Sequence, residues 1–97
     1  RPAGSYAAGH VPGAVNLPYH GLSAESTAKL STDTVYVVYD DGLFDNAGTK
    51  TALRLAALGF RVKELMGGLE GWKAEGYPVA AGTAPGKLVA KPALARL

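Results

Sequence analysis

The sequence has 97 residues and contains no cysteine. Disulfides, cysteine-based zinc sites and thiol chemistry are therefore excluded within this chain. It also has no apolar run near the length of about 20 residues that crosses a membrane, and no signal-peptide pattern. We therefore expect no membrane partner, and the cytoplasm is the default location when no targeting segment is visible.

A strong excess of charge of one sign is also lacking. Ten basic and eight acidic residues give a net charge of +2. The basic residues are scattered and form no continuous basic stretch, so we expect no nucleic-acid partner. A hydrophobic content of 47% with 19% charged residues is typical of a globular protein. The length predicts one small domain.

The stretch from Val35 to Gly59 organises the chain. Its first part, Val35–Tyr39, is a run of β-branched and aromatic residues, which predicts a strand covered on both faces. A polar loop follows, and then a helix that we expect to start after Asn46 as N-cap and to run to Leu58. A helix N-terminus after a strand is a favourable place for an anion, because the first N–H groups have no partner within the helix.

The loop itself is acidic, which contradicts an anion site. Asp40, Asp41 and Asp45 are three of the eight acidic residues of the chain. Asp40 is a candidate acceptor for the N–H groups of the loop, which makes it an internal anion. Gly48 weakens the first helical turn, which suggests that another group approaches the backbone closely there.

Shorter segments on both sides complete the predicted fold. Ala14–Leu17 and Phe60–Leu65 are expected to be strands, and Ser23–Leu30 and Leu69–Glu75 are expected to be helices. This alternation predicts an α/β protein with a parallel sheet and helices on both faces. Ligands of such sheets bind beyond the carboxyl ends of the strands, a rule that selects the loop at 40–46.

Three features outside the loop lead to structural predictions. His10 lies between a glycine and a turn, so we expect it to bond the backbone and fix the loop rather than act as a base. Trp72 is expected to be a core anchor. Residues 80–97 are rich in alanine and proline, and we interpret them as a tail beyond a domain at 1–79. The tail is expected to dock through four apolar residues, Leu88, Val89, Leu94 and Leu97.

Two segments of the chain resemble the signatures of the rhodanese-like domain family. RPAGSYAAGHVPGAVNLP (Arg1–Pro18) is similar to the opening signature, an Arg, then Tyr or Phe, then G-H-I/V-P-G-A-x-N. GFRVKELMGGLEGWKAEGYPV (Gly59–Val79) is similar to the closing signature, L-x-G-G-x-x-x-W-x-x-x-G-x-P-V. The two occur in the right order, with a strand, loop and helix between them, and the resemblance covers residues 1–79.

The resemblance implies a sulfurtransferase fold and locates its site. Active members carry a cysteine directly after the central strand, and the matching position here is Asp40. A subgroup with a longer loop has a second cysteine before an Asn, with a Lys four residues after that Asn. Here these positions are Asp45, Asn46 and Lys50. The remaining loop residues that would cradle the anion are Asp41, Gly42, Leu43 and Phe44. The implied ligands are a small anion or a thiol, without a cofactor.

The two aspartates change the expected function. A carboxylate cannot form a persulfide, because that chemistry needs a thiolate as nucleophile and carrier. We therefore predict a catalytically inactive domain with a binding or regulatory role. The alternative is a sulfurtransferase whose nucleophile was substituted at Asp40 or Asp45. A further alternative is that Asp40, Asp41, Asp45 and Asn46 bind a hard cation such as Ca²⁺ or Mg²⁺.

The family also has a helix and a strand before the segment that begins here. That strand ends in Asp-x-Arg, and Arg1 matches its Arg. Without the strand, we expect a gap in the sheet and an edge with unpaired backbone groups. A protein partner or a missing N-terminal segment is expected to fill this gap.

Overall fold

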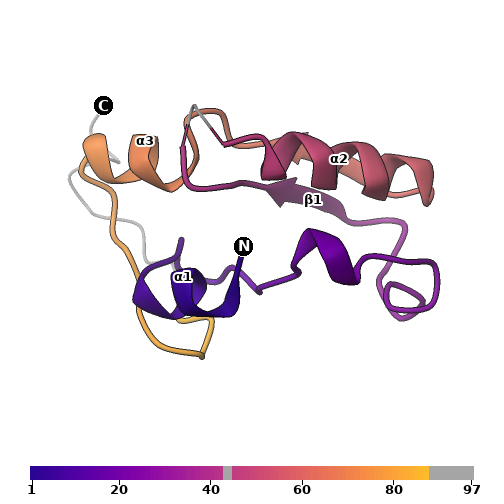
Figure 1. Ribbon diagram of the computed structural model, residues 1–97, viewed down its shortest axis with the longest axis horizontal. Coiled ribbons are helices and arrows are strands. Elements are labelled where there is room, and N and C mark those ends of the chain that lie inside the picture. The colour runs from indigo at the N-terminus through magenta and orange to yellow at the C-terminus, as the bar shows by residue number, and fades with distance from the viewer. Residues whose placement is uncertain (43–44, 88–97) are drawn as a thin grey trace.

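The computed structural model describes residues 1–42 and 45–87 of the chain. It has a small α/β fold, shown in Figure 1, in which β1, α2 and α3 lie in the upper part of the view and α1 lies below them. None of the helices within the described ranges has the length and apolar character needed to cross a membrane. The elements, in chain order, are α1 (Ala3–Ala8), the 3-10 helix η1 (Tyr19–Gly21), β1 (Val35–Val38), α2 (Ala47–Ala57), β2 (Arg61–Glu64) and α3 (Gly68–Ala74).

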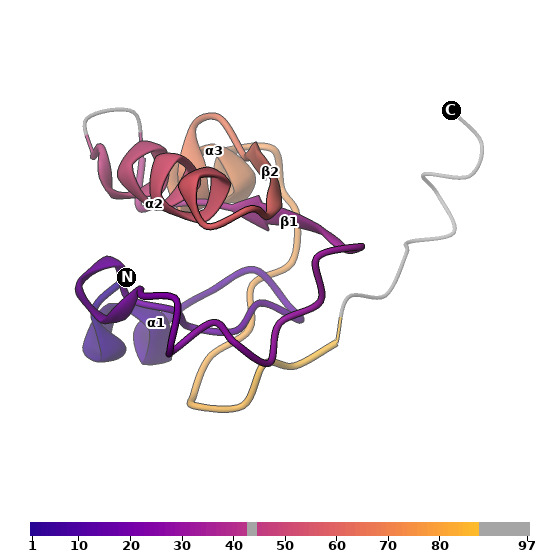
Figure 2. The ribbon, with the colours of Figure 1, turned by 90° about the vertical axis from the view of Figure 1, so that its right-hand side faces the viewer.

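The sheet consists of two parallel strands in the described part of the chain. Val35 of β1 lies opposite Arg61 of β2, and Val38 lies opposite Glu64. The helix α2 connects the two strands and packs on both of them. In Figure 2, α2, α3 and the strand pair lie in the upper part of the view, and α1 with the chain that follows it lies below them. The predicted parallel arrangement is therefore confirmed for these two strands.

The core lies where α2 meets β1, β2 and the chain near η1. Leu22, Leu55 and Phe60 are its buried residues. The ring of Tyr36 meets that of Phe60 edge-on, with centroids 5.7 Å apart. Other apolar side chains are half-buried around this cluster, namely Leu17, Tyr19, Leu30, Val38, Leu58 and Val62. These contacts fix β1 and α2 relative to each other.

The prediction that both faces of β1 are covered is wrong. Burial alternates along the strand, and the side chain of Val37 is 60% exposed. Successive side chains of a strand point to opposite faces, so Tyr36 and Val38 reach the core while Val35 and Val37 do not. The apolar run therefore has a buried face and an exposed face.

The predicted strand Ala14–Leu17 is not a strand in the structure. A strand is defined by a hydrogen-bonded neighbour, and within residues 1–42 and 45–87 this segment pairs with none. Val15 is 75% exposed. The segment is instead separated from β1 by a cavity, described below.

The predicted helix Ser23–Leu30 is also wrong, because residues 24–29 form turns. Ser23 acts as the expected cap, and its Oγ accepts the N–H of Ser26 at 3.0 Å. Ser26 Oγ donates to the carbonyl of Gly21, and Thr27 Oγ1 donates to that of Ser23. Hydroxyl groups that bond nearby carbonyls give the backbone an alternative to the helix.

Trp72 does not anchor the core. It anchors the segment that follows α3. Its side chain is half-buried, and Nε1 donates to the carbonyl of Pro78 at 2.6 Å. Its ring lies against that of Tyr77, with centroids 4.8 Å apart. The prediction of a core anchor is therefore corrected: Trp72 fixes the chain that follows α3. The apolar tail residues, from Leu88 onward, lie outside the described residues.

Candidate functional site

Asp40 lies two residues after the end of β1 and is buried, with 5% of its surface exposed. Its Oδ2 accepts the backbone N–H of Gly48, in the first turn of α2, at 2.9 Å. This N–H is one of the groups that have no partner within the helix. The carboxylate of Asp40 thus occupies the position at which a helix N-terminus binds an anion, as the sequence predicts for an internal anion.

Two glycines make room for Asp40. A Cβ on Gly68 would collide with the backbone carbonyl of Asp40, and the φ of +57° at Gly68 also disfavours a side chain. A Cβ on Gly48 would lie 3.0 Å from Oδ2 of Asp40, which confirms the predicted close approach at Gly48. The carbonyl of Asp40 accepts the N–H of Leu69 at 2.9 Å. Asp40 therefore joins β1 to the first turns of both α2 and α3.

Asp41 connects the loop to α1 through Arg1. Nε of Arg1 donates to Oδ1 of Asp41 at 2.9 Å, and Nη2 lies 2.8 Å from the same oxygen. The Arg1 side chain is only 6% exposed and also donates to the carbonyls of Gly9, at 2.7 Å, and Ser5. On the main chain, the carbonyl of Asp41 accepts the N–H of Glu70. The acidic charge of Asp41 is thus neutralised by a buried guanidinium.

The cap of α2 comes from Asp45 and not from Asn46. Oδ1 of Asp45 accepts the N–H of Ala47 at 3.0 Å, whereas Asn46 makes no side-chain cap hydrogen bond. Asn46 holds the N-cap position that the sequence predicts, but the predicted capping side chain is wrong. An aspartate one residue earlier forms an Asx turn and reaches the same end of the helix.

Of the other predicted cradle residues, Gly42 and Lys50 lie within the described part of the chain. Gly42 is buried, and a Cβ there would meet the side chain of Glu70. Lys50 is exposed, and its side chain has no ion pair or hydrogen bond with the described residues. Leu43 and Phe44 lie outside those residues.

The electrostatic environment of the loop opposes a bound anion. Asp40, Asp41 and Asp45 all lie in this loop, and among the described residues only Asp41 is paired with a cationic side chain. The hard-cation alternative finds no support, because residues 1–42 and 45–87 contain no cluster of three acidic, His or Cys side chains that could hold a metal ion.

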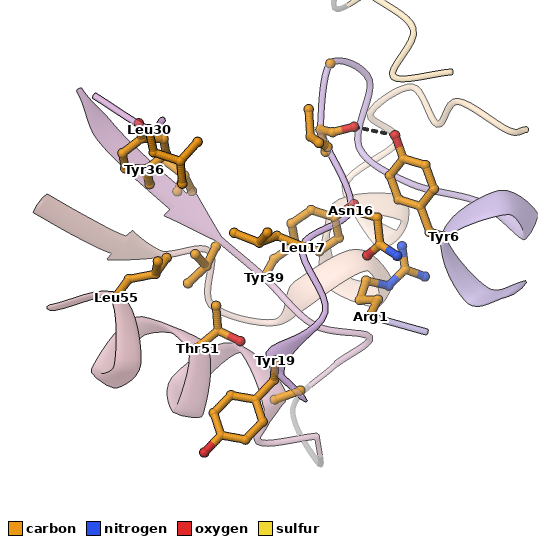
Figure 3. Close-up of a pocket in the computed structure, with 16 residues that line it drawn as sticks. Arg1, Tyr6, Asn16, Leu17, Tyr19, Leu30, Tyr36, Tyr39, Thr51 and Leu55 are labelled. Carbon is orange, nitrogen blue, oxygen red and sulfur yellow. Dashed lines mark hydrogen bonds between the residues drawn. The ribbon is translucent and has the colours of Figure 1, made fainter. Parts of the chain in front are cut away.

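A cavity of about 390 Å³ lies beside the free edge of β1. Figure 3 shows Leu17 and Tyr39 near its middle, with Arg1 and Tyr6 on one side and Tyr36 on the other. Two backbone segments, 36–39 and 13–17, line it on facing sides together with side chains of α2. The cavity therefore lies between β1 and the segment that the sequence predicts as a strand, in the place where a gap in the sheet is expected.

The description of the rhodanese-like domain family matches residues 1–75. The chain belongs to the rhodanese-like domain family. An HTH-type transcriptional regulator of Mycobacterium tuberculosis is 38% identical over 87 residues, which are 89% of this chain and 38% of that protein. The crystal structure of the BH2092 protein from Bacillus halodurans superposes with a TM-score of 0.80 at 35% identity, over 99% of this chain and 71% of that one.

Sequence reasoning missed the contribution of Arg1 and Gly68 to this rhodanese-like site. It identified Arg1 only as part of a signature and Gly68 only as part of a turn. A signal for Gly68 was present in the pair Gly67–Gly68, because adjacent glycines favour left-handed backbone, and both have positive φ. No local signal links Arg1 to Asp41, since the two are 40 residues apart.

Proposed function

We propose that this rhodanese-like domain is non-catalytic and has a binding or regulatory role. The observation that carries the proposal is the buried carboxylate of Asp40 at the N-terminus of α2. Family resemblance assigns the sulfur-carrying cysteine to this position. A carboxylate has no sulfur with which to form a persulfide, and the chain has no cysteine that could replace it.

The charge of the loop supports a role other than sulfur transfer. An incoming thiosulfate would meet Asp40 in the position of the bound anion and Asp45 at the same helix end. Like charges at such distances repel each other, and more strongly where water is partly excluded. A regulatory role agrees with the relative that is named as a transcriptional regulator, of which this chain covers 38%.

A sulfur-transfer assay tests the proposal directly. The chain is incubated with thiosulfate and cyanide, and thiocyanate formation is compared with a protein-free blank. We expect no turnover above the blank, and measurable turnover would overturn the proposal. The alternative, a sulfurtransferase with a substituted nucleophile, predicts that Asp40→Cys or Asp45→Cys restores activity. If neither variant acts, the scaffold has lost more than its nucleophile.

The internal-anion interpretation has its own test. Removal of the carboxylate in Asp40→Ala frees the N–H of Gly48, so sulfate or thiosulfate should raise the melting temperature of this variant more than that of the original chain. Asp33→Ala is the matched control, because Asp33 is an exposed acid in another loop. Equal stabilisation of all three proteins by sulfate would show that Asp40 does not occupy the anion position.

The binding role requires a surface, and we assign it to the cavity along β1. The carbonyl of Val38 faces β2 and accepts the N–H of Leu65 at 2.8 Å. Residues of a strand direct their backbone N–H and C=O alternately to its two edges, so those of Val37 and Tyr39 face the cavity. Apolar walls and a row of backbone groups suit an extended apolar polypeptide, from a protein partner or a segment that precedes Arg1, because a small apolar ligand offers no partners to that row.

Amide hydrogen exchange can test this assignment. An extension rich in Val, Ile and Thr, added before Arg1, should protect the amides of Val37 and Tyr39, and an extension of Gly and Ser of equal length should not. The same apolar segment added as a free peptide distinguishes a partner from an attached segment. Unchanged exchange at Val37 with both the extension and the peptide would contradict the assignment.

A further inference from the structure

His10 is enclosed by three backbone carbonyl groups. Its surface is 0% exposed, and its ring stacks on that of Tyr6 with centroids 3.9 Å apart and planes at 7°. Nδ1 lies 2.9 Å from the carbonyl oxygen of Tyr6. Nε2 lies 3.1 Å from the carbonyl oxygen of Ala84 and 3.0 Å from that of Pro85. Each ring nitrogen therefore faces only acceptors.

A proton on each nitrogen would satisfy all three carbonyl contacts. A neutral imidazole has one N–H donor and one lone pair, so either tautomer would direct a lone pair at a carbonyl oxygen about 3 Å away. Only the imidazolium donates to both sides. We propose that His10 is a proton-dependent latch: as an imidazolium it holds residues 80–85, here named the strap, against α1, and loss of one ring proton releases the strap.

The strap depends on these polar contacts because it buries little. Residues 81–87 are exposed, so they gain little from apolar burial. The backbone of His10 exchanges two hydrogen bonds with that of Ala80, at 2.9 and 2.8 Å. Gly82 donates to the carbonyl of Ala7, and Gly13 donates to that of Pro85, both at 2.7 Å. All of these bonds join the strap to residues 7–13, and local opening is expected where hydrogen bonds are few and exposed.

Few other titratable groups face the latch. The strap has the sequence AAGTAP and carries none. On α1 the group is Tyr6, whose hydroxyl donates to the carbonyl of Ala14. In the turn after His10, the N–H of Val11 donates to the hydroxyl of Tyr39. The nearest charged pair along the chain is Arg1 with Asp41, since Arg1 binds the carbonyl of the residue before His10. His10 is thus the group whose proton distinguishes the closed strap from the open one.

The latch also reaches the cavity beside β1. Gly13 and Ala14 line that cavity, and they are held by Pro85 and Tyr6 respectively. Release of the strap removes the partner of the Gly13 N–H and loosens one wall. Through this wall, the protonation of His10 is coupled to the shape of the cavity.

NMR on the intact chain tests the latch. The ¹⁵N and ¹H signals of the imidazole should show protons on both nitrogens of His10 in the strap-closed protein. Exchange of the Gly13, Ala80 and Gly82 amides, corrected for the intrinsic effect of pH, should speed up on the order of tenfold as His10 loses its proton, as expected for the loss of about one hydrogen bond. A single neutral tautomer with the strap closed, or amide protection that does not change with this proton, would overturn the proposal.

His20 provides the matched control, because it is exposed in η1. His20→Gln should keep the pH dependence of strap protection, and His10→Gln should abolish it. If His10→Gln fails to fold, the spectra of the original chain and of His20→Gln still decide the question. Strap protection that loses its pH dependence in His20→Gln would count against the latch.

Discussion

The two free sides of β1 differ in kind. At its carboxyl end, polar groups of the loop bond to other parts of the protein: Asp40 to α2 and α3, and Asp41 to Arg1. Along the edge that faces away from β2, β1 borders an apolar cavity and pairs with no other strand in the described part of the chain. The end that family resemblance assigns to chemistry is filled by the protein's own carboxylate, and the edge is open. The comparison favours a surface that binds over a site that reacts.

The substitution with the largest expected effect disrupts the packing at the carboxyl end of β1. Gly68→Ala places a Cβ against the backbone of Asp40 at a positive φ, and backbone cannot move aside as a flexible side chain can. We expect a loss of at least about 2 kcal/mol in the free energy of unfolding, measured with urea. Gly4→Ala is the control, because nothing lies within 4 Å of a Cβ there. A cost below that of the control would contradict the tight fit.

Removal of the carboxylate should have the next largest effect. Asp40→Ala leaves the buried N–H of Gly48 without its partner and removes a charge-assisted hydrogen bond. The expected loss of unfolding free energy is about 1–3 kcal/mol. Asp40→Asn keeps an acceptor oxygen and should lose less. If Asp33→Ala, at an exposed site, costs as much as Asp40→Ala, the packing at the carboxyl end of β1 does not depend on Asp40.

A pair of matched substitutions on β1 compares its two faces. Val38→Thr places a hydroxyl toward the core and should cost about 1–2 kcal/mol. Val37→Thr makes the same chemical change on the exposed face and should lie within about 0.5 kcal/mol of zero. Equal costs in urea unfolding would show that the exposed face of the strand is covered in solution.

Much of the central unit was predictable from local pattern. The run Val35–Tyr39, the apolar spacing after Asn46 and the stop at Gly59 predict β1 and α2 because each depends on neighbouring residues alone. The predictions at 14–17 and 23–30 failed for two physical reasons. The first segment lacks a paired strand, and hydroxyl groups in the second bond to nearby carbonyls.

The features of the candidate site also divide into those that local sequence predicts and those that it does not. The acidic loop, the internal anion at Asp40 and the close approach at Gly48 follow from residue types at known spacing. Asp45 and Asn46 both have side chains that can cap a helix, so residue type does not decide between them. The backbone turn in the folded chain directs Asp45, and not Asn46, to the N–H of Ala47. The ion pair of Arg1 with Asp41 and the fit of Gly68 against Asp40 join residues far apart in the chain, which no local pattern encodes.

The sequence by itself determined the family, the parallel α/β core and the absence of any thiol, because signatures and composition do not depend on packing. Only the tertiary structure decided what the unusual residues do. It placed Asp40 on the N–H of Gly48, enclosed His10 in carbonyl groups and left a cavity along β1. These roles arise from contacts between segments distant in the sequence, and such contacts form only when the chain is packed.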